Sequence, residues 1–335
     1  GGEGGMESKL ISRLNLPYQE IPAAGVHGIG LRSLPGNIFK LLKGVWKSVK
    51  ILKQFRPDVI YYTGGYVAAP MAIAGVKKQS ILYVPDIEPG LALKFIARFA
   101  DVIALTTDSS SEFFNPSKMV EVTGYPLRSE LKRIPKIEAR QVFGLHEHLP
   151  VIFIFGGSKG SHSINQVILQ NLETLLAKTQ IIHITGSFDW PQVQQEYSNL
   201  QPDLAGNYHI FPYLHEEMSA AFSSADLCIC RAGASTLGEL PFFELPAILV
   251  PYPYAWRYQK INAQFLVDQN AAIMMPDKEM NLRLVKELFG LLEDTERLHS
   301  MRVNLKFLAK PDAAIQIGKL ILNRFNLANQ KGGHA

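Results

Sequence analysis

Cysteine is nearly absent from this chain: its 335 residues include only Cys228 and Cys230. The two lie two positions apart in one predicted strand, so their side chains share a sheet face and are badly placed for a disulfide with each other. No metal-ligand spacing surrounds them. We therefore expect both to be small core residues of a reduced, cytoplasmic protein.

Long apolar runs and dense charge are also missing. No run reaches the ~20 residues that a membrane-spanning helix needs. Hydrophobic residues make up 47% of the chain and charged residues 19%, which excludes a disordered chain and suffices for two domains with separate cores. The net charge of +4 suits anionic substrates or an anionic surface, but it identifies neither.

The most informative segment is the glycine turn at residues 156–160. It follows the apolar run 151–155, which is typical of a buried parallel strand, and precedes a helical repeat of apolar residues that begins at Ile164. A strand that enters a helix through such a turn leaves backbone N–H groups unpaired at the positive end of the helix dipole. A phosphate is a natural occupant, although an ordinary glycine-rich turn would look the same.

Strands and helices alternate along most of the chain. We predict strands at residues 58–62, 80–84, 102–105, 119–122, 151–155, 181–184, 208–212, 226–230 and 247–250. The alternation predicts an α/β fold with two doubly wound parallel sheets. Residues 128–140 are typical of a linker, so we expect domains at 1–130 and 131–310 and a C-terminal helical segment, 311–335, that returns to the first domain.

The first domain begins abnormally. The glycines at positions 1–5 look like a phosphate loop, but no strand precedes them. A doubly wound domain normally begins with its central strand. We therefore expect the first β-α-β unit of this domain to be absent from the given sequence and the domain to be incomplete.

A second strand-to-helix turn follows residue 230. Ser235 and Thr236 supply hydroxyl donors for phosphate oxygens, and Glu239 lies one helical turn beyond Ser235. A carboxylate there can accept both hydroxyls of a ribose, although it could also be a solvated helix residue. Two phosphate-ready turns in one domain favour a nucleotide diphosphate as the ligand.

A third polar cluster spans residues 251–262, again after an apolar strand. Gln259 and Asn262 are three positions apart and share one helix face. Amide side chains suit sugar hydroxyls because each offers both donors and an acceptor. Alone, the cluster could be a polar surface turn.

In this order and spacing, the clusters resemble glycosyltransferase family 28, the MurG-like transferases, over nearly the whole chain. The motifs that carry the resemblance are Gly156-Gly157-Ser158-x-Gly160 with Asn165, Arg231-x-Gly233-Ala234-x-Thr236-x-x-Glu239, Gln259-x-x-Asn262, Gly64-Gly65-Tyr66-Val67 followed by Pro70, and Gly124-x-Pro126-x-Arg128.

The resemblance implies a fold, a reaction and partners. The fold is GT-B, with two Rossmann-like domains. The reaction is transfer of N-acetylglucosamine from UDP-GlcNAc, with inversion and without a bound metal or other cofactor, to an undecaprenyl-linked lipid acceptor in peptidoglycan synthesis. The location is the cytoplasmic face of the inner membrane, as a peripheral protein without a nucleic-acid partner.

The resemblance also assigns residues. Tyr213 and Leu214 would flank the uracil and Glu239 would hold the ribose. The diphosphate would contact Arg128, Ser158 and the turn at 234–236, and the sugar would face Gln259 and Asn262. The full donor set is Arg128, Gly157, Ser158, Gly160, Asn165, Tyr213, Leu214, Gly233, Ala234, Ser235, Thr236, Glu239, Gln259 and Asn262. The acceptor diphosphate would lie at Gly64, Gly65 and Tyr66.

The chain departs from the family where a general base is needed. The family's first glycine loop, with the histidine favoured as base, would precede Gly1. The family's His-Glu-Gln-Asn motif is replaced by Tyr83-Val84-Pro85-Asp86. The remaining base candidates are Asp86 and Glu88, and Glu88 is more easily explained as a cap of the helix after Pro89.

A possible membrane face lies at residues 38–55. A predicted helix there places Ile38, Leu41, Leu42, Val45, Val49 and Leu52 on one face and Lys40, Lys43, Lys47 and Lys50 opposite, with Phe39 and Trp46 on the border. Such a helix either packs on its own sheet with a solvated lysine face or contacts lipid headgroups. The family uses this region for membrane contact.

Two other functions stay open. A related transferase could use a different lipid acceptor, since the altered segment 83–86 belongs to the acceptor half. The chain could also bind a UDP-sugar without catalysis, as the missing first unit suggests.

Overall fold

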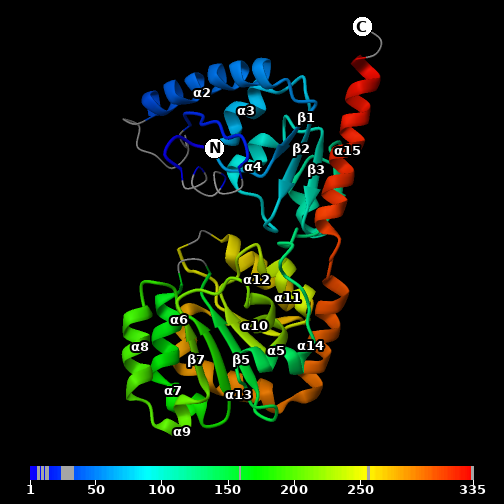
Figure 1. Ribbon diagram of the computed structural model, residues 1–335. Helices are drawn as coiled ribbons and strands as arrows, with labels where there is room; N and C mark the ends of the chain where they lie inside the picture. Colours follow the sequence, from blue (N-terminus) through cyan, green and yellow to red (C-terminus); the bar gives the residue numbers. More distant parts are fainter. Residues whose placement is uncertain are drawn as a thin grey trace. The chain divides into compact units, whose positions relative to one another are not determined.

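The computed structural model describes residues 1–5, 8, 11, 15–23, 34–157, 160–254 and 257–332. The chain forms two compact units, Gly1–Thr123 with Asp312–Ala335 and Gly124–Pro311 (Figure 1). The passage between them comes earlier than the expected 130/131 boundary, because the segment after residue 124 belongs to the second unit. A Cβ at Gly238 of α11 would lie 2.7 Å from Tyr125 Cβ, and the Ser219 hydroxyl donates to Glu130 O at 3.1 Å.

The described part of the first unit contains a four-stranded parallel sheet. Its strands are β1 (Val59–Tyr62), β2 (Gln79–Val84), β3 (Val102–Leu105) and β4 (Met119–Val122), in the order β1-β2-β3-β4. The inner strands β2 and β3 are almost wholly buried and apolar, as expected for a parallel sheet covered on both faces.

Helices surround this sheet. They are α2 (Leu34–Phe55), α3 (Ala68–Ala74), α4 (Leu91–Ile96) and α15 (Ala313–Gly332), together with the short 3₁₀ helix η1 (Asp108–Phe113). Helix α15 packs against β1 and β2, and its Arg324 lies 3.5 Å from the Gln79 side-chain oxygen. The last helix therefore belongs to the first unit although it follows the second in the chain (Figure 1).

The second unit contains a six-stranded parallel sheet. Its strands are β5 (Val151–Phe155), β6 (Gln180–Ile184), β7 (Tyr208–Phe211), β8 (Leu227–Cys230), β9 (Ala247–Leu249) and β10 (Ala272–Met274). Their order is β10-β9-β8-β5-β6-β7, so the chain begins in the middle, winds to one edge, and returns to wind to the other. The order reverses between β5 and β8, and ligands of such sheets bind at this point, beyond the carboxyl ends of the strands.

The second unit's helices cover both faces of its sheet (Figure 1). They are α5 (Lys136–Val142), α6 (His162–Gln170), α7 (Leu172–Leu176), α8 (Trp190–Asn199), α9 (Pro202–Ala205), α10 (Met218–Ser224), α11 (Thr236–Phe243), α12 (Tyr258–Asp268), η2 (Asp277–Glu279), α13 (Met280–Glu293) and α14 (Thr295–Leu308). Alternation along β5 divides the core. Ile152 and Ile154 pack with α6, α7, α13 and α14. On the other face, the Phe153 ring meets the Phe222 ring of α10 edge-on, with 5.1 Å between the ring centroids.

The cysteines follow the same alternation. Cys228 and Cys230 are free, fully buried and on one face of β8. Burial is the largest cause that raises the pKa of the Cys228 thiol, and its contacts with Cys230 raise that pKa further. They are core residues, as predicted.

The predicted strands all exist, and β3, β4 and β5 have the predicted bounds. Strand β10 was not predicted. The predicted linker contains helix α5, which packs on α10.

Two glycine positions shape the turn between β5 and α6. Gly157 and Gly160 have φ angles of +87° and +76°, in the left-handed region that side chains disfavour. A Cβ at Gly160 would lie 2.2 Å from the carbonyl oxygen of Thr185. The turn therefore lies directly against the end of β6, and only glycine fits there.

A chain of buried polar side chains holds α6 beneath this turn. The Asn165 amide donates to Thr185 O at 2.8 Å and to Asp189 at 2.6 Å. Its oxygen accepts from His183 Nε2 at 2.9 Å, which leaves His183 Nδ1 to accept from the Tyr208 hydroxyl at 2.8 Å. Burial lowers the pKa of His183 to about 3, so this tautomer stays neutral.

Candidate functional site

A cavity of about 250 Å³ lies at the carboxyl ends of the second unit's strands. It is lined by Tyr125, Pro126, Leu127, Arg128, Phe155, Gly157, Ile184, Tyr213, Leu214, Met218, Ser235 and Glu239. Both strands at the order reversal contribute to it, β5 through Phe155 and Gly157 and β8 through the turn that carries Ser235. The cavity is therefore where the topology predicts a ligand.

Glu239 is the charged group on the α11 side of this cavity. Its side chain is buried, and the Ser235 hydroxyl donates to its Oε2 at 2.9 Å. Burial raises the pKa of Glu239, against the lowering effects of Ser235 and of the Arg128 charge. A buried carboxylate with further acceptor capacity gains stability from added hydroxyl donors, and a diol supplies two.

The turn before α11 supplies backbone donors. The N–H of Thr236 donates to Gly233 O at 3.1 Å, and its hydroxyl donates to the same oxygen at 2.6 Å. Among the described residues, the N–H groups of Ala234 and Ser235 precede the first backbone hydrogen bond of this turn. They lie at the positive end of an eight-residue helix, a suitable position for an anion.

The opposite wall is aromatic and apolar. Tyr213 is 46% exposed, so its ring can pack against a ligand, and the buried Leu214 adds an apolar surface to the cavity. The exposed Arg128 lines the same cavity and brings a positive charge toward Glu239. An aromatic ring, a carboxylate, free amides and an arginine suit the base, ribose and phosphates of a nucleotide.

The predicted donor residues therefore divide into two groups. The structure brings Arg128, Gly157, Tyr213, Leu214, Ser235 and Glu239 together around the cavity. It places Gly160, Asn165, Gly233, Ala234, Thr236, Gln259 and Asn262 behind or beside that wall. Ser158 lies outside the described residues.

Asn165, Asn262 and Gln259 make hydrogen bonds that support the turns around the cavity. Asn165 is buried, and both ends of its amide bond to protein groups. Asn262 is fully buried and donates to Ala232 O at 3.2 Å, which holds the turn after β8. Gln259 accepts from the N–H of Tyr252 at 2.8 Å and so orders the loop after β9.

Sequence patterns assigned no role to several supporting groups, among them Arg231, which belongs to a family motif. Arg231 is buried and donates to Asp277 at 2.6 Å and to the Ser163 hydroxyl at 2.7 Å, joining the turn after β8 to α6 and η2. Asp189 accepts from Asn165 and bonds His162 Nδ1 at 2.7 Å. Neither aspartate belongs to a motif: Asp189 follows the predicted strand 181–184 by a few residues, and Asp277 follows β10, which was not predicted.

The predicted acceptor residues lie in the first unit. Gly64 and Gly65 form the turn after β1 with φ of +102° and +75°, and Tyr66 beside them is 55% exposed. A Cβ at Gly64 would lie 2.8 Å from Leu93 Cδ2, so glycine lets this turn rest on α4.

The two base candidates differ in environment. Asp86 is half-buried after β2, and its backbone oxygen accepts from the Ser110 hydroxyl at 3.4 Å. Glu88 is 4% exposed and lies 3.5 Å from Lys94 Nζ. Gly90, not Glu88, holds the N-cap position of α4, so Glu88 contacts the helix through its ion pair with Lys94.

Within the described residues, no group of three or more His, Cys, Asp or Glu side chains is arranged to hold a metal ion.

Comparison with known proteins identifies the family. The glycosyltransferase family 28 N-terminal domain matches residues 1–105, and the glycosyltransferase family 28 C-terminal domain matches residues 151–317.

Curated relatives agree over nearly the full length. The UDP-N-acetylglucosamine--N-acetylmuramyl-(pentapeptide) pyrophosphoryl-undecaprenol N-acetylglucosamine transferase of Roseiflexus sp. is 34% identical, over 96% of this chain and 82% of the relative. The protein of the same name from Caldanaerobacter subterraneus is 33% identical, over 96% and 89%.

A solved structure gives the same result in three dimensions. The crystal structure of Acinetobacter baumannii MurG matches with a TM-score of 0.77 and 28% identity, covering 96% of this chain and 89% of that one. The two parallel-sheet α/β units are those of the GT-B fold. The chain belongs to glycosyltransferase family 28.

Proposed function

We propose that this chain transfers N-acetylglucosamine from UDP-GlcNAc to the undecaprenyl-pyrophosphoryl-linked N-acetylmuramyl-pentapeptide. The observation that carries the proposal is the cavity beyond β5 and β8, whose lining suits a uridine diphosphate. The similarity to transferases named for this reaction, over 96% of the chain, supports the same donor and acceptor.

The proposed donor pose follows from the cavity's lining. The uracil lies at Tyr213 and Leu214, the ribose hydroxyls donate to Glu239, and the diphosphate accepts from the N–H groups of residues 234 and 235. From the family resemblance, Ser158 stays the proposed contact of the diphosphate, and Gln259 and Asn262 stay the proposed contacts of the sugar.

Catalysis in this proposal is mainly electrostatic. As the bond to the sugar breaks, negative charge grows on the leaving UDP. Arg128 and the amides at the start of α11 are positioned before the reaction, so they stabilise that charge without reorganising. This arrangement requires no metal or other cofactor and is consistent with inversion by one direct displacement.

The attacking hydroxyl needs a base, and we place Asp86 before Glu88. Glu88 is buried and paired with Lys94, which suits a structural role. Asp86 is half-buried in the loop after β2. Gly64, Gly65 and Tyr66 are the proposed contacts of the acceptor diphosphate.

Helix α2 supports a peripheral position on the cytoplasmic face of the membrane. Of its predicted apolar face, Leu41, Val45 and Leu52 are half-buried, whereas Ile38, Leu42 and Val49 are exposed. Gly44 and Ser48 face inward, and a Cβ at Gly44 would lie 2.3 Å from Pro22 O, so these small residues let the helix approach closely.

Several large apolar residues of α2 are exposed. Phe39, Leu42 and Trp46 are 70%, 62% and 70% exposed, and they lie among exposed lysines. Apolar side chains interleaved with lysines suit an anionic lipid surface. Among the described helices, none has the length and apolar character to span a membrane.

The ribose assignment predicts how Glu239→Gln changes binding. We expect UDP to bind roughly 10- to 100-fold more weakly, because hydrogen bonds to a charged acceptor contribute about 1.5–3 kcal/mol. Calorimetry with UDP and 2′-deoxy-UDP checks this: the wild type should prefer UDP strongly and the variant only slightly. Glu173→Gln, an exposed residue of α7, is the control, and an unchanged preference in Glu239→Gln would contradict the assignment.

The activity itself is tested by transfer of radiolabelled N-acetylglucosamine to the undecaprenyl-linked acceptor. We expect transfer by the wild type and a fall in kcat of roughly 10²- to 10⁴-fold in Asp86→Asn, with UDP-GlcNAc binding unchanged, as loss of a general base requires. Glu88→Gln should mainly lower stability. UDP-GlcNAc binding without any transfer would refute the proposed activity and leave a UDP-sugar-binding protein.

Membrane contact is tested by sedimentation with phosphatidylglycerol vesicles. We expect the double variant Leu42→Gln/Trp46→Gln to bind at least about tenfold more weakly, because each side chain loses about 1.5–3 kcal/mol of apolar burial when fully inserted. Leu282→Gln, 87% exposed on α13, is the control. Equal sedimentation of the double variant and the wild type would exclude α2 as the contact.

A further inference from the structure

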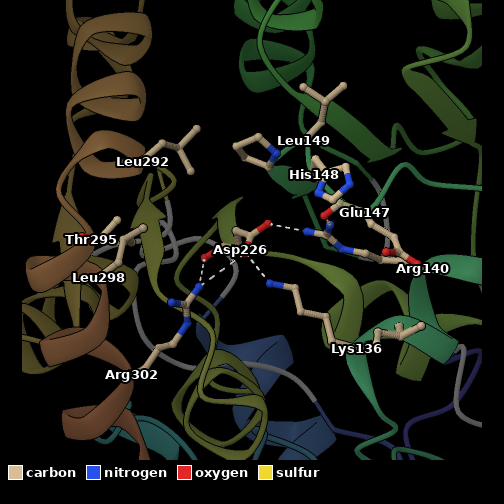
Figure 2. Close-up of a pocket in the computed structure, with 12 residues that line it drawn as sticks. Lys136, Arg140, Glu147, His148, Leu149, Asp226, Leu292, Thr295, Leu298 and Arg302 are labelled. Atoms are coloured by element: carbon tan, nitrogen blue, oxygen red, sulfur yellow. Dashed lines mark hydrogen bonds and ion pairs between the residues drawn. The ribbon is translucent and has the colours of Figure 1, made fainter.

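A second cavity lies at the opposite end of the second unit's sheet. It has a volume of about 490 Å³ and is lined by Lys136, Ile137, Arg140, Glu147, His148, Leu149, Pro150, Asp226, Leu292, Thr295, Leu298 and Arg302 (Figure 2). Pro150 and Asp226 directly precede β5 and β8, so this cavity lies at the amino ends of the same strands whose carboxyl ends form the UDP site. The two sites cannot share a ligand.

Three basic side chains converge on one carboxylate in this cavity (Figure 2). Arg140 Nη2 donates to Asp226 Oδ2 at 2.8 Å, Lys136 Nζ donates to Oδ1, and Arg302 Nη2 lies 3.6 Å from Oδ1. The N–H of Val151 also donates to Oδ2, at 2.9 Å. The carboxylate oxygens of Asp226 therefore have their hydrogen-bond donors, whereas the basic side chains around it keep N–H groups that Asp226 does not use.

The positive charge is only partly compensated. Asp226 is one negative charge among three positive ones, and the other carboxylate of the lining, Glu147, is exposed. Arg140 is buried, bonds the backbone oxygens of His146 and Glu147, and has an Nε without a partner in the described structure. Its charge is held in the wall of the cavity and is poorly screened by water.

Two of the three cations can reach a ligand. The side chains of Lys136 and Arg302 are 45% and 34% exposed. After their contacts with Asp226, the ammonium has further protons and the guanidinium further N–H groups to donate. A lysine and an arginine from different helices, α5 and α14, suit the several oxygens of a phosphate better than a planar carboxylate.

The rest of the lining is apolar. Ile137, Leu149 and Pro150 face it from one side and Leu292 and Leu298 from α13 and α14, with the hydroxyl of Thr295 beside them. We propose that this cavity binds a phosphorylated small molecule, with the phosphate at Lys136 and Arg302 and an apolar body against the leucines. The proposal is independent of the transferase function.

Phenyl phosphate is the probe that tests this proposal, with UDP present at saturation to fill the donor cavity. We expect calorimetry of the wild type to give one phenyl phosphate per chain, and inorganic phosphate to bind the same site more weakly because it lacks the apolar body. Arg302→Gln and Lys136→Gln should each weaken binding by roughly tenfold or more, since each loses a charge-assisted hydrogen bond. Arg297→Gln, an exposed arginine of the same helix outside the cavity, should bind as the wild type does.

Two results would overturn the proposal. One is the absence of phenyl phosphate binding to the UDP-saturated wild type, which would make the cluster a purely structural network around Asp226. The other is equal binding by Arg297→Gln and the two cavity variants. Circular dichroism and UDP binding of each variant verify its fold. If Arg302→Gln does not fold, Lys136→Gln, whose residue is the more exposed, decides.

Discussion

The parallel arrangement of the strands is the constraint on which the rest of the second unit depends. All six strands run the same way, so the turns that follow them meet at one edge. The order reverses between β5 and β8, and these two strands carry the glycine turn and the turn of Ser235. One nucleotide can therefore be held by segments that lie far apart in the chain, from Arg128 to Glu239, without any long loop.

Buried polar bonds then fix these turns in place. Gly160 rests on the end of β6, and Asn165, His183 and Asp189 hold α6 beneath it. Arg231 joins the second turn to the first through Ser163. Asn165, His183, Asp189 and Arg231 are buried, so breaking one of their bonds leaves an unsatisfied polar group shielded from water. Donor binding depends in this way on residues that do not line the cavity.

The sequence predicted the fold well because parallel strands are continuous apolar runs with a turn at each end. It placed Glu239 in the same pocket as Ser235 because the two residues are one helical turn apart, and both line the cavity. It did not show that both ends of the Asn165 amide bond protein groups, since a motif gives a position and not the direction of a side chain. Ile164 and Ile168 on the same side of α6 were a usable signal that Asn165 points inward. It did not predict that Gly44 and Ser48 of α2 are buried, because counting large apolar residues overlooks small ones, whose size permits close packing.

A crystal structure of the chain with UDP tests the central claim most directly, because it locates the ligand without assuming a reaction. The account predicts the uracil at Tyr213 and Leu214, both ribose hydroxyls within about 3.2 Å of the Glu239 carboxylate, and the diphosphate at the N–H groups of residues 234 and 235. UDP bound away from the carboxyl ends of β5 and β8, or bound there with its ribose turned from Glu239, would contradict it.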